Sequence, residues 1–225
     1  MKKTYATSLI SLASATLLSA AVSAQEVSFD ATVATDYVWR GVSQTAGDAA
    51  LQLGAEVTTG HFYAGVWGSN VDFGDGTDVE MDLYAGFAPS VSGFDLDFGW
   101  VRYTYPGAPS ASGDQDFDEF YAGVGRSYGA LSWDAKWSWS EDFYLHSGNA
   151  TYLEGGVAWA LSDAFSVDAR YGRSRFDDLI GADYDDWQLG VSWQTGPVAL
   201  GARWHDSEID DSRFVASVGY SLSRN

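Results

Sequence analysis

The sequence predicts an all-β protein, an up-and-down transmembrane β-barrel of twelve antiparallel strands. Three observations predict it: side chains that alternate with period two, connections that alternate between short and long, and aromatic residues near the strand ends. The alternation is clearest in 131–140, where the odd positions carry Leu, Ala and three Trp, and the even positions carry Ser, Asp and Lys. Three tryptophans on one face suit a lipid boundary better than a soluble core, because Trp prefers sites where one edge is wet.

Residues 1–24 have the features of a secretory signal peptide. They begin with Met1 and two lysines, contain a short apolar centre at 9–18, lack acidic residues and end on small residues. The apolar run is too short and too rich in Ser and Thr for a membrane helix. We expect cleavage before Gln25, which leaves 25–225 as one outer-membrane barrel domain. Removing the leader takes the formal net charge from −19 to −21, so nucleic acid is not expected as a partner.

The remaining chain divides into twelve alternating segments of about ten residues, the length that a tilted strand needs to cross a bilayer. The predicted strands are 27–39, 51–57, 62–71, 79–87, 94–102, 119–124, 131–140, 151–161, 165–174, 184–194, 198–205 and 213–223. In the first of them Tyr37 and Trp39 are expected on the outer face. The facing of 62–71 stays open, because both of its faces carry apolar residues. Arg102 falls on the lipid side near a strand end, where it either reaches the headgroups or marks a bulge.

The connections alternate between five short turns and six longer loops. The loops are 40–49, 72–78, 105–116, 141–150, 175–183 and 205–212, and they hold 15 of the 31 acidic residues. Outer-membrane barrels show this asymmetry, with short periplasmic turns and long external loops. The alternative is a secreted β-sandwich whose aromatic residues fill a core, but a sandwich has no reason to alternate short and long connections along the chain.

Two segments near the start of the barrel domain carry a resemblance to a known family. They are Asp36-Tyr-Val-Trp-Arg-Gly-Val-Ser-Gln44 and Gly60-His-Phe-Tyr-Ala-Gly-Val-Trp-Gly-Ser-Asn-Val-Asp-Phe73, followed by Asp82-Leu-Tyr-Ala-Gly86. They resemble the TorF-type putative porins of proteobacteria over roughly the first third of the mature chain. The resemblance implies an outer-membrane barrel, and it implies more about the fold than about the solute.

The inner faces of the predicted strands are strongly acidic. The expected pore-lining residues are Asp30, Glu56, Glu80, Asp82, Asp95, Asp97, Glu119, Asp134, Lys136, Glu154, Asp168, Arg170, Arg203 and Arg213. Acids outnumber bases, so a water-filled lumen would enrich cations and repel anions. The alternative is that these groups form ion pairs and hydrogen bonds that fill a closed barrel, because twelve strands lie between the filled and the open sizes.

No catalytic residue, metal site or cofactor site is expected. The chain has no Cys, and the acidic loop residues lack the spacing of a calcium loop. Those acids, expected on a solvated outer surface, are Asp206, Glu208, Asp210, Asp211, Asp177, Asp178, Asp183, Asp185 and Asp186. His146 beside Ser147 is the only hint of a lipid hydrolase, and adjacency alone does not make a nucleophile and base.

The sequence therefore predicts a passive porin in the outer membrane of a Gram-negative bacterium, for small hydrophilic solutes and preferably cations. Its expected surroundings are outer-membrane lipid and lipopolysaccharide, and a homo-oligomer is compatible with this interpretation. The rival hypothesis is a non-conducting barrel whose acidic loops serve adhesion or surface structure. An outer-membrane lipid hydrolase is a more distant third.

Overall fold

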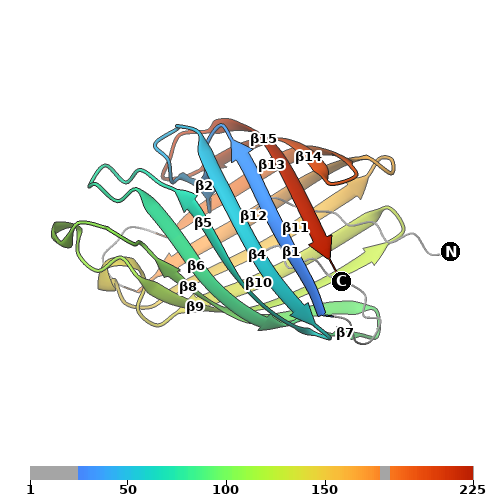
Figure 1. The fold of residues 1–225 in the computed structure, drawn as a ribbon, viewed down its shortest axis with the longest axis horizontal. Coiled ribbons are helices and arrows are strands. Elements are labelled where there is room, and N and C mark those ends of the chain that lie inside the picture. Colours follow the sequence, from blue (N-terminus) through green and yellow to red (C-terminus); the bar gives the residue numbers. More distant parts are fainter. Residues whose placement is uncertain (1–24, 178–182, 225) are drawn as a thin grey trace.

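The computed structural model describes residues 25–177 and 183–224, and its architecture is a closed antiparallel barrel (Figure 1). The predicted signal peptide, 1–24, lies outside the described residues. The long strands are β1 (Gln25–Ala34), β4 (Ala50–Thr59), β5 (Phe62–Asn70), β6 (Val79–Phe87), β8 (Phe94–Thr104), β9 (Phe117–Tyr128), β10 (Leu131–Ser140), β11 (Ala150–Ala160), β12 (Phe165–Phe176), β13 (Tyr184–Thr195), β14 (Val198–Ser207) and β15 (Arg213–Arg224). These are the twelve strands that the sequence predicts, so the predicted fold class is confirmed.

The ring closes through two pairings. Strands β1 and β15 lie side by side, with Val27 opposite Arg224, and strands β6 and β8 pair from Met81 opposite Thr104 to Phe87 opposite Phe98 (Figure 1). The two-residue strand β7 (Ser90–Val91) pairs only with β8 and is not one of the strands that form the ring. Every long strand therefore has two neighbours, and no long strand is left as an open edge.

Short elements occupy three of the connections. Strands β2 (Val38–Trp39) and β3 (Val42–Ser43) form a hairpin between β1 and β4. The single-turn 3-10 helices η1 (Ser110–Ser112) and η2 (Tyr144–His146) lie in the loops before β9 and β11. We call the end of the barrel with these longer connections the loop end, and the opposite end the turn end. Among the described residues, no helix is both long and apolar enough to cross a membrane.

Burial is inverted relative to a soluble protein. The large apolar side chains of the strands face outward and are exposed, among them Phe29 at 56%, Trp159 at 58% and Phe214 at 67%. Most of the buried side chains are polar or aromatic, and Ser138 and Asp82 are 0% and 1% exposed. An apolar outer band and a polar interior suit a barrel surrounded by hydrocarbon.

The structure also decides the two strand orientations that the sequence leaves open. In β5 the exposed Phe62 and Val66 face outward, whereas Tyr63 is 7% exposed and faces the interior. Register is unbroken through β8, so Arg102 lies on the outer face without a bulge. There its Nη1 lies 2.7 Å from Oδ2 of Asp118.

One predicted strand is wrong at its end. Strand β1 stops at Ala34, and the chain then leaves the sheet as the hairpin of β2 and β3. Tyr37 is 4% exposed, and Trp39 packs against buried aromatic residues, so neither faces lipid. The reason is that Tyr37 and Trp39 gain interior partners from distant strands, which outweigh the continuation of the β1 alternation.

Candidate functional site

The candidate site is the hairpin at 35–49, which folds into the loop end of the barrel. Its turn consists of Arg40 and Gly41, with φ angles of 47° and 78°. Positive φ at both central residues is the geometry of a two-residue hairpin, and glycine adopts it without strain. Arg40 adopts it at a cost, and a strained backbone of this kind persists only where surrounding contacts hold it.

Arg40 is held by a carboxylate and two aromatic rings. Its Nη2 lies 2.8 Å from Oε1 and 2.6 Å from Oε2 of Glu119 on β9. The guanidinium carbon is 4.2 Å from the ring centroid of Trp39 and 4.2 Å from that of Tyr152 on β11. The side chains of Arg40 and Glu119 are 10% and 5% exposed, so this pair is shielded from screening by salt. We call Arg40, Trp39, Glu119 and Tyr152 the cation cage.

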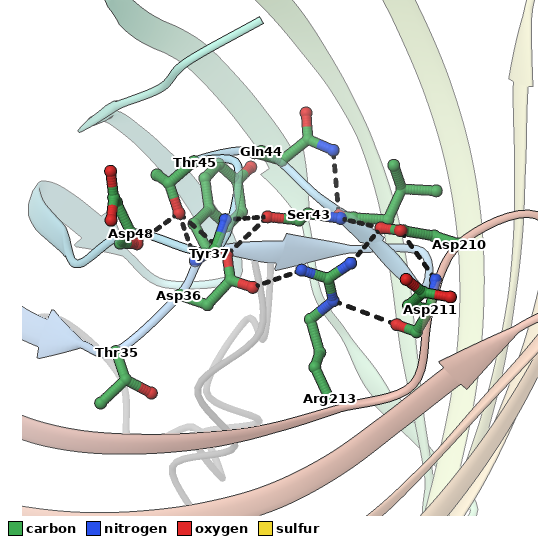
Figure 2. A network of polar contacts seen from close by, with 12 residues as sticks. Thr35, Asp36, Tyr37, Ser43, Gln44, Thr45, Asp48, Asp210, Asp211 and Arg213 are labelled. Carbon is green, nitrogen blue, oxygen red and sulfur yellow. Dashed lines mark hydrogen bonds and ion pairs between the residues drawn. The ribbon is translucent and has the colours of Figure 1, made fainter.

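A second group of contacts anchors the base of the hairpin to β15 and the loop before it (Figure 2). Nη1 of Arg213 lies 2.9 Å from Oδ2 of Asp36, and its Nη2 lies 2.6 Å from Oδ2 of Asp210. Asp36 also accepts hydrogen bonds from the hydroxyls of Ser43, at 2.7 Å, and Thr45, at 2.8 Å. These contacts join residues from opposite ends of the chain, and they fix the hairpin inside the barrel.

The hairpin also packs closely against the wall. The ring centroid of Trp39 lies 5.7 Å from that of Tyr103, and the Trp39 ring is stacked on Phe143 with centroids 6.3 Å apart. The hydroxyl of Tyr37 donates a hydrogen bond of 2.9 Å to Glu80 on β6. A Cβ added at Gly41 would lie 2.6 Å from Cβ of Ser207 and 2.7 Å from Cβ of Asp186, so only glycine fits there. The hairpin therefore fills part of the lumen at the loop end.

The structure places all fourteen sequence-predicted site residues on the faces opposite the exposed apolar side chains. Eight of them form ion pairs: Lys136 and Arg170 with Glu154, Arg170 also with Asp134, Arg203 with Asp168, Glu119 with Arg40, and Arg213 with Asp36. The remaining six acids have no ion pair within the described part of the chain. They are Asp30, Glu56, Glu80, Asp82, Asp95 and Asp97.

These six acids share one side of the barrel. They lie on β1, β4, β6 and β8, which with β5 form a continuous arc, and the strands of this arc carry no Lys or Arg on the inner face. We call it the acidic arc. Five of its acids bond to hydroxyls; Asp30 contacts Ser221 and Asp97 contacts Tyr63, for example. The basic residues Lys136, Arg170, Arg203 and Arg213 lie on β10, β12, β14 and β15, in the remaining part of the ring.

Asp82 is the exception in the acidic arc. It is 1% exposed, and neither carboxylate oxygen has a hydrogen-bond partner. Glu80 and Glu119 are the acids that interact with it electrostatically. A buried carboxyl group without a hydrogen-bond partner is costly, and Asp82 is the one acid of the acidic arc in that condition.

Two of the acids expected in solvated loops differ from the sequence-based expectation. Asp186 lies on β13 rather than in a solvated loop; it is 7% exposed and accepts a hydrogen bond from Tyr152 at 3.0 Å. Asp210 bonds to the hairpin rather than to solvent alone. Both are drawn inward because basic or hydroxyl partners lie there. Asp178 lies outside the described residues.

The pair His146 and Ser147 is not assembled for catalysis. Nδ1 of His146 lies 2.6 Å from Asp142, and Nε2 lies 3.7 Å from Asp114. The hydroxyl oxygen of Ser147 has no hydrogen-bond partner. In the described part of the chain, no three His, Asp or Glu side chains are grouped to hold a metal ion.

The exposed histidine gives a pH-dependent prediction. The hydrogen bond to Asp142 raises the pKa of His146 above its ordinary value of 6.5. The interaction therefore stabilises the loop fully below pH 6.5 and is lost as the pH rises through the raised pKa. We expect NMR titration of labelled histidines in micelles to show a midpoint above 6.5. Asp142→Asn should lower that midpoint, and an unchanged midpoint would contradict the contact.

The barrel, its inverted burial and its charged inner face are those of the outer-membrane porin class of folds. Consistent with this, the chain belongs to the family described as "Bacterial protein of unknown function (Gcw_chp)", which matches residues 19–224. The family description gives no activity and does not include the TorF-type name. No curated protein sequence matches the chain.

Solved structures support the same fold. The "KdgM porin" is similar with a TM-score of 0.62 and 8% identity, over 88% of this chain and 99% of that chain. The KdgM porin "in complex with disordered oligogalacturonate" gives a TM-score of 0.63, also at 8% identity and over the same shares of the two chains. The NanC porin gives 0.55 at 10% identity, over 90% of this chain and 100% of that chain. At these identities the similarity shows the fold alone.

Proposed function

We propose that this protein is a passive diffusion pore in the outer membrane of a Gram-negative bacterium, exported with removal of residues 1–24. The pore admits small hydrophilic solutes, prefers cations, and is narrowed at the loop end by the hairpin at 35–49. The observation that carries the proposal is the acidic arc, which places six acids without an ion pair in the described residues on one side of a closed barrel. The apolar outer band contacts outer-membrane lipid and lipopolysaccharide.

Electrostatics sets the direction of selectivity. Carboxylates along a wall surrounded by hydrocarbon focus a negative potential into the lumen, which enriches cations and raises the barrier for anions. The ion pairs on β10 to β15 are neutral as pairs, so they do not cancel this potential. One similar porin is solved with oligogalacturonate, a polyanion. The acidic arc disfavours solutes of that charge in this protein.

The resemblance to TorF-type putative porins supports the same function. One segment that carries it, 36–44, forms the hairpin, and the other, 60–73, includes strand β5 of the acidic arc. The part of the chain that resembles these porins is therefore the part that shapes the lumen.

The experiment is conductance of the refolded mature protein in planar bilayers under a KCl gradient. We expect discrete current steps and a reversal potential with the sign of potassium selectivity, because the acidic arc attracts cations. Steps with chloride selectivity would contradict the charge assignment. The absence of steps, with insertion verified by protease protection, would contradict the pore.

The packing of the hairpin favours one other function, a non-conducting structural barrel. Tyr37 belongs to a buried hydrophobic cluster at the loop end and Trp39 packs against it, and Ser138, Ser140 and Ser174 are at most 2% exposed. A barrel filled in this way could present its acidic loops without conducting. The same bilayer experiment separates the two functions.

A further inference from the structure

We infer that the lumen contains a binding site for organic cations that carry a guanidinium or primary ammonium group, at the position that Arg40 occupies in this structure. The inference rests on the proposed pore and names its solute class. Arg40 shows the chemistry that the site accepts: a planar cation that meets a carboxylate at its edge and aromatic rings on its faces.

The barrel supplies most of this site. Glu119 lies on β9 and Tyr152 on β11, whereas only Arg40 and Trp39 belong to the hairpin. The hydroxyl of Tyr152 lies 3.0 and 3.2 Å from the two carboxylate oxygens of Asp186, which holds the ring in place independently of Arg40. A carboxylate and an aromatic face would therefore remain in position if the hairpin moved.

The charge balance around the site favours a cation. Asp82 interacts electrostatically with both Glu80 and Glu119, and Arg40 is the one base that pairs with this group in the described part of the chain. Both oxygens of Asp82 lack a hydrogen-bond partner although the residue is 1% exposed. An ammonium or guanidinium group would supply the donors that Asp82 lacks.

The occupant is organic rather than a metal ion. Within residues 25–177 and 183–224, no three His, Asp or Glu side chains are arranged to hold a metal. The acids are instead surrounded by aromatic residues, since Tyr37 bonds to Glu80 and Tyr103 lies opposite Asp82 in the neighbouring strand. Carboxylates combined with aromatic faces recognise cations that also bear apolar surface.

A solute cation can displace Arg40 because the backbone of Arg40 is strained. Its φ of 47° lies in the left-handed region that non-glycine residues disfavour. The hairpin strands β2 and β3 are two residues each, so side-chain contacts rather than a long backbone ladder hold the hairpin. A solute cation that replaces Arg40 at Glu119 releases this strain.

The first test is chemical rescue with methylguanidinium. We expect the refolded variant Arg40→Ala to bind methylguanidinium saturably by isothermal titration calorimetry, at least about tenfold more tightly than the wild type does. Adding Glu119→Gln should abolish this binding. Arg102→Ala is the matched control, because it removes an arginine from an ion pair that is about 40% exposed on the outer face. Equal binding by Arg40→Ala and Arg102→Ala would overturn the inference.

The second test needs no change at Arg40. Arginine added to wild-type channels in planar bilayers should reduce the potassium current in a saturable way, whereas its neutral isostere citrulline should not. Glu119→Gln should weaken the effect of arginine at least about tenfold. Channels that respond equally to arginine and citrulline would overturn the inference and leave the pore intact. If no channels form, the proposed pore fails, and methylguanidinium binding to Arg40→Ala still decides the site.

Discussion

Gly41→Val is expected to raise the unit conductance at least about twofold, because it prevents the hairpin from seating in the lumen. The new Cβ would overlap with Cβ of Ser207 and Asp186, two atoms fixed to the backbone of neighbouring strands. The barrel wall cannot yield to this overlap without breaking the pairing of β13 and β14, so the hairpin moves instead. Single-channel recordings in symmetric KCl measure the effect.

Gly47→Val is the matched control. Gly47 lies in the same connection and has a φ of 84°, close to the 78° of Gly41, so a substitution strains the backbone equally. No atom lies within 4 Å of a Cβ added there. We expect its conductance to equal that of the wild type. If both variants behave alike, backbone strain rather than seating explains the result, and the hairpin does not restrict the pore.

The second large effect is a reversal of ion selectivity. The double variant Glu56→Lys and Asp97→Lys replaces two negative charges of the acidic arc by positive ones near the turn end. Neither acid has an ion pair in the described part of the chain, so no buried base is left unpaired. We expect the reversal potential in a KCl gradient to change sign towards chloride selectivity.

The control variant makes the same change in net charge, but in the loops rather than in the acidic arc. Asp48→Lys together with Glu141→Lys alters two exposed acids of the loops. It should shift the reversal potential only slightly, since charges in bulk water are screened within about 10 Å at 0.1 M salt. An equal shift in both double variants would mean that surface charge, not the acidic arc, sets selectivity. Glu80 is unsuitable for charge reversal, because its side chain is 2% exposed and accepts a hydrogen bond from Tyr37.

The sequence predicts most of the barrel because period-two alternation reports directly which face each side chain occupies. Segment 131–140 has the same bounds as strand β10, and the parity of short and long connections agrees with the closed ring. The alternation likewise assigns the inner faces of β6 and β8. A local pattern suffices in these cases, because facing depends only on neighbours in the chain.

The hairpin could not be predicted in the same way. Tyr37 and Trp39 continue the alternation of β1, so period alone extends that strand past its end at Ala34. Their interior position depends on partners far along the chain, such as Glu80 for Tyr37. The local signal was Gly41, since glycine readily adopts the positive φ that a two-residue turn requires.

The pairing of β1 with β15 has a consequence for biogenesis. It places Val27 opposite Arg224, so the strands cannot close into a ring until nearly the whole polypeptide has been made. Contacts between such distant positions slow folding, because the chain must be brought together before they form. Arg213, which anchors the hairpin, belongs to the same last strand, β15. Closure of the cylinder and narrowing of its mouth are therefore late and coupled events in assembly.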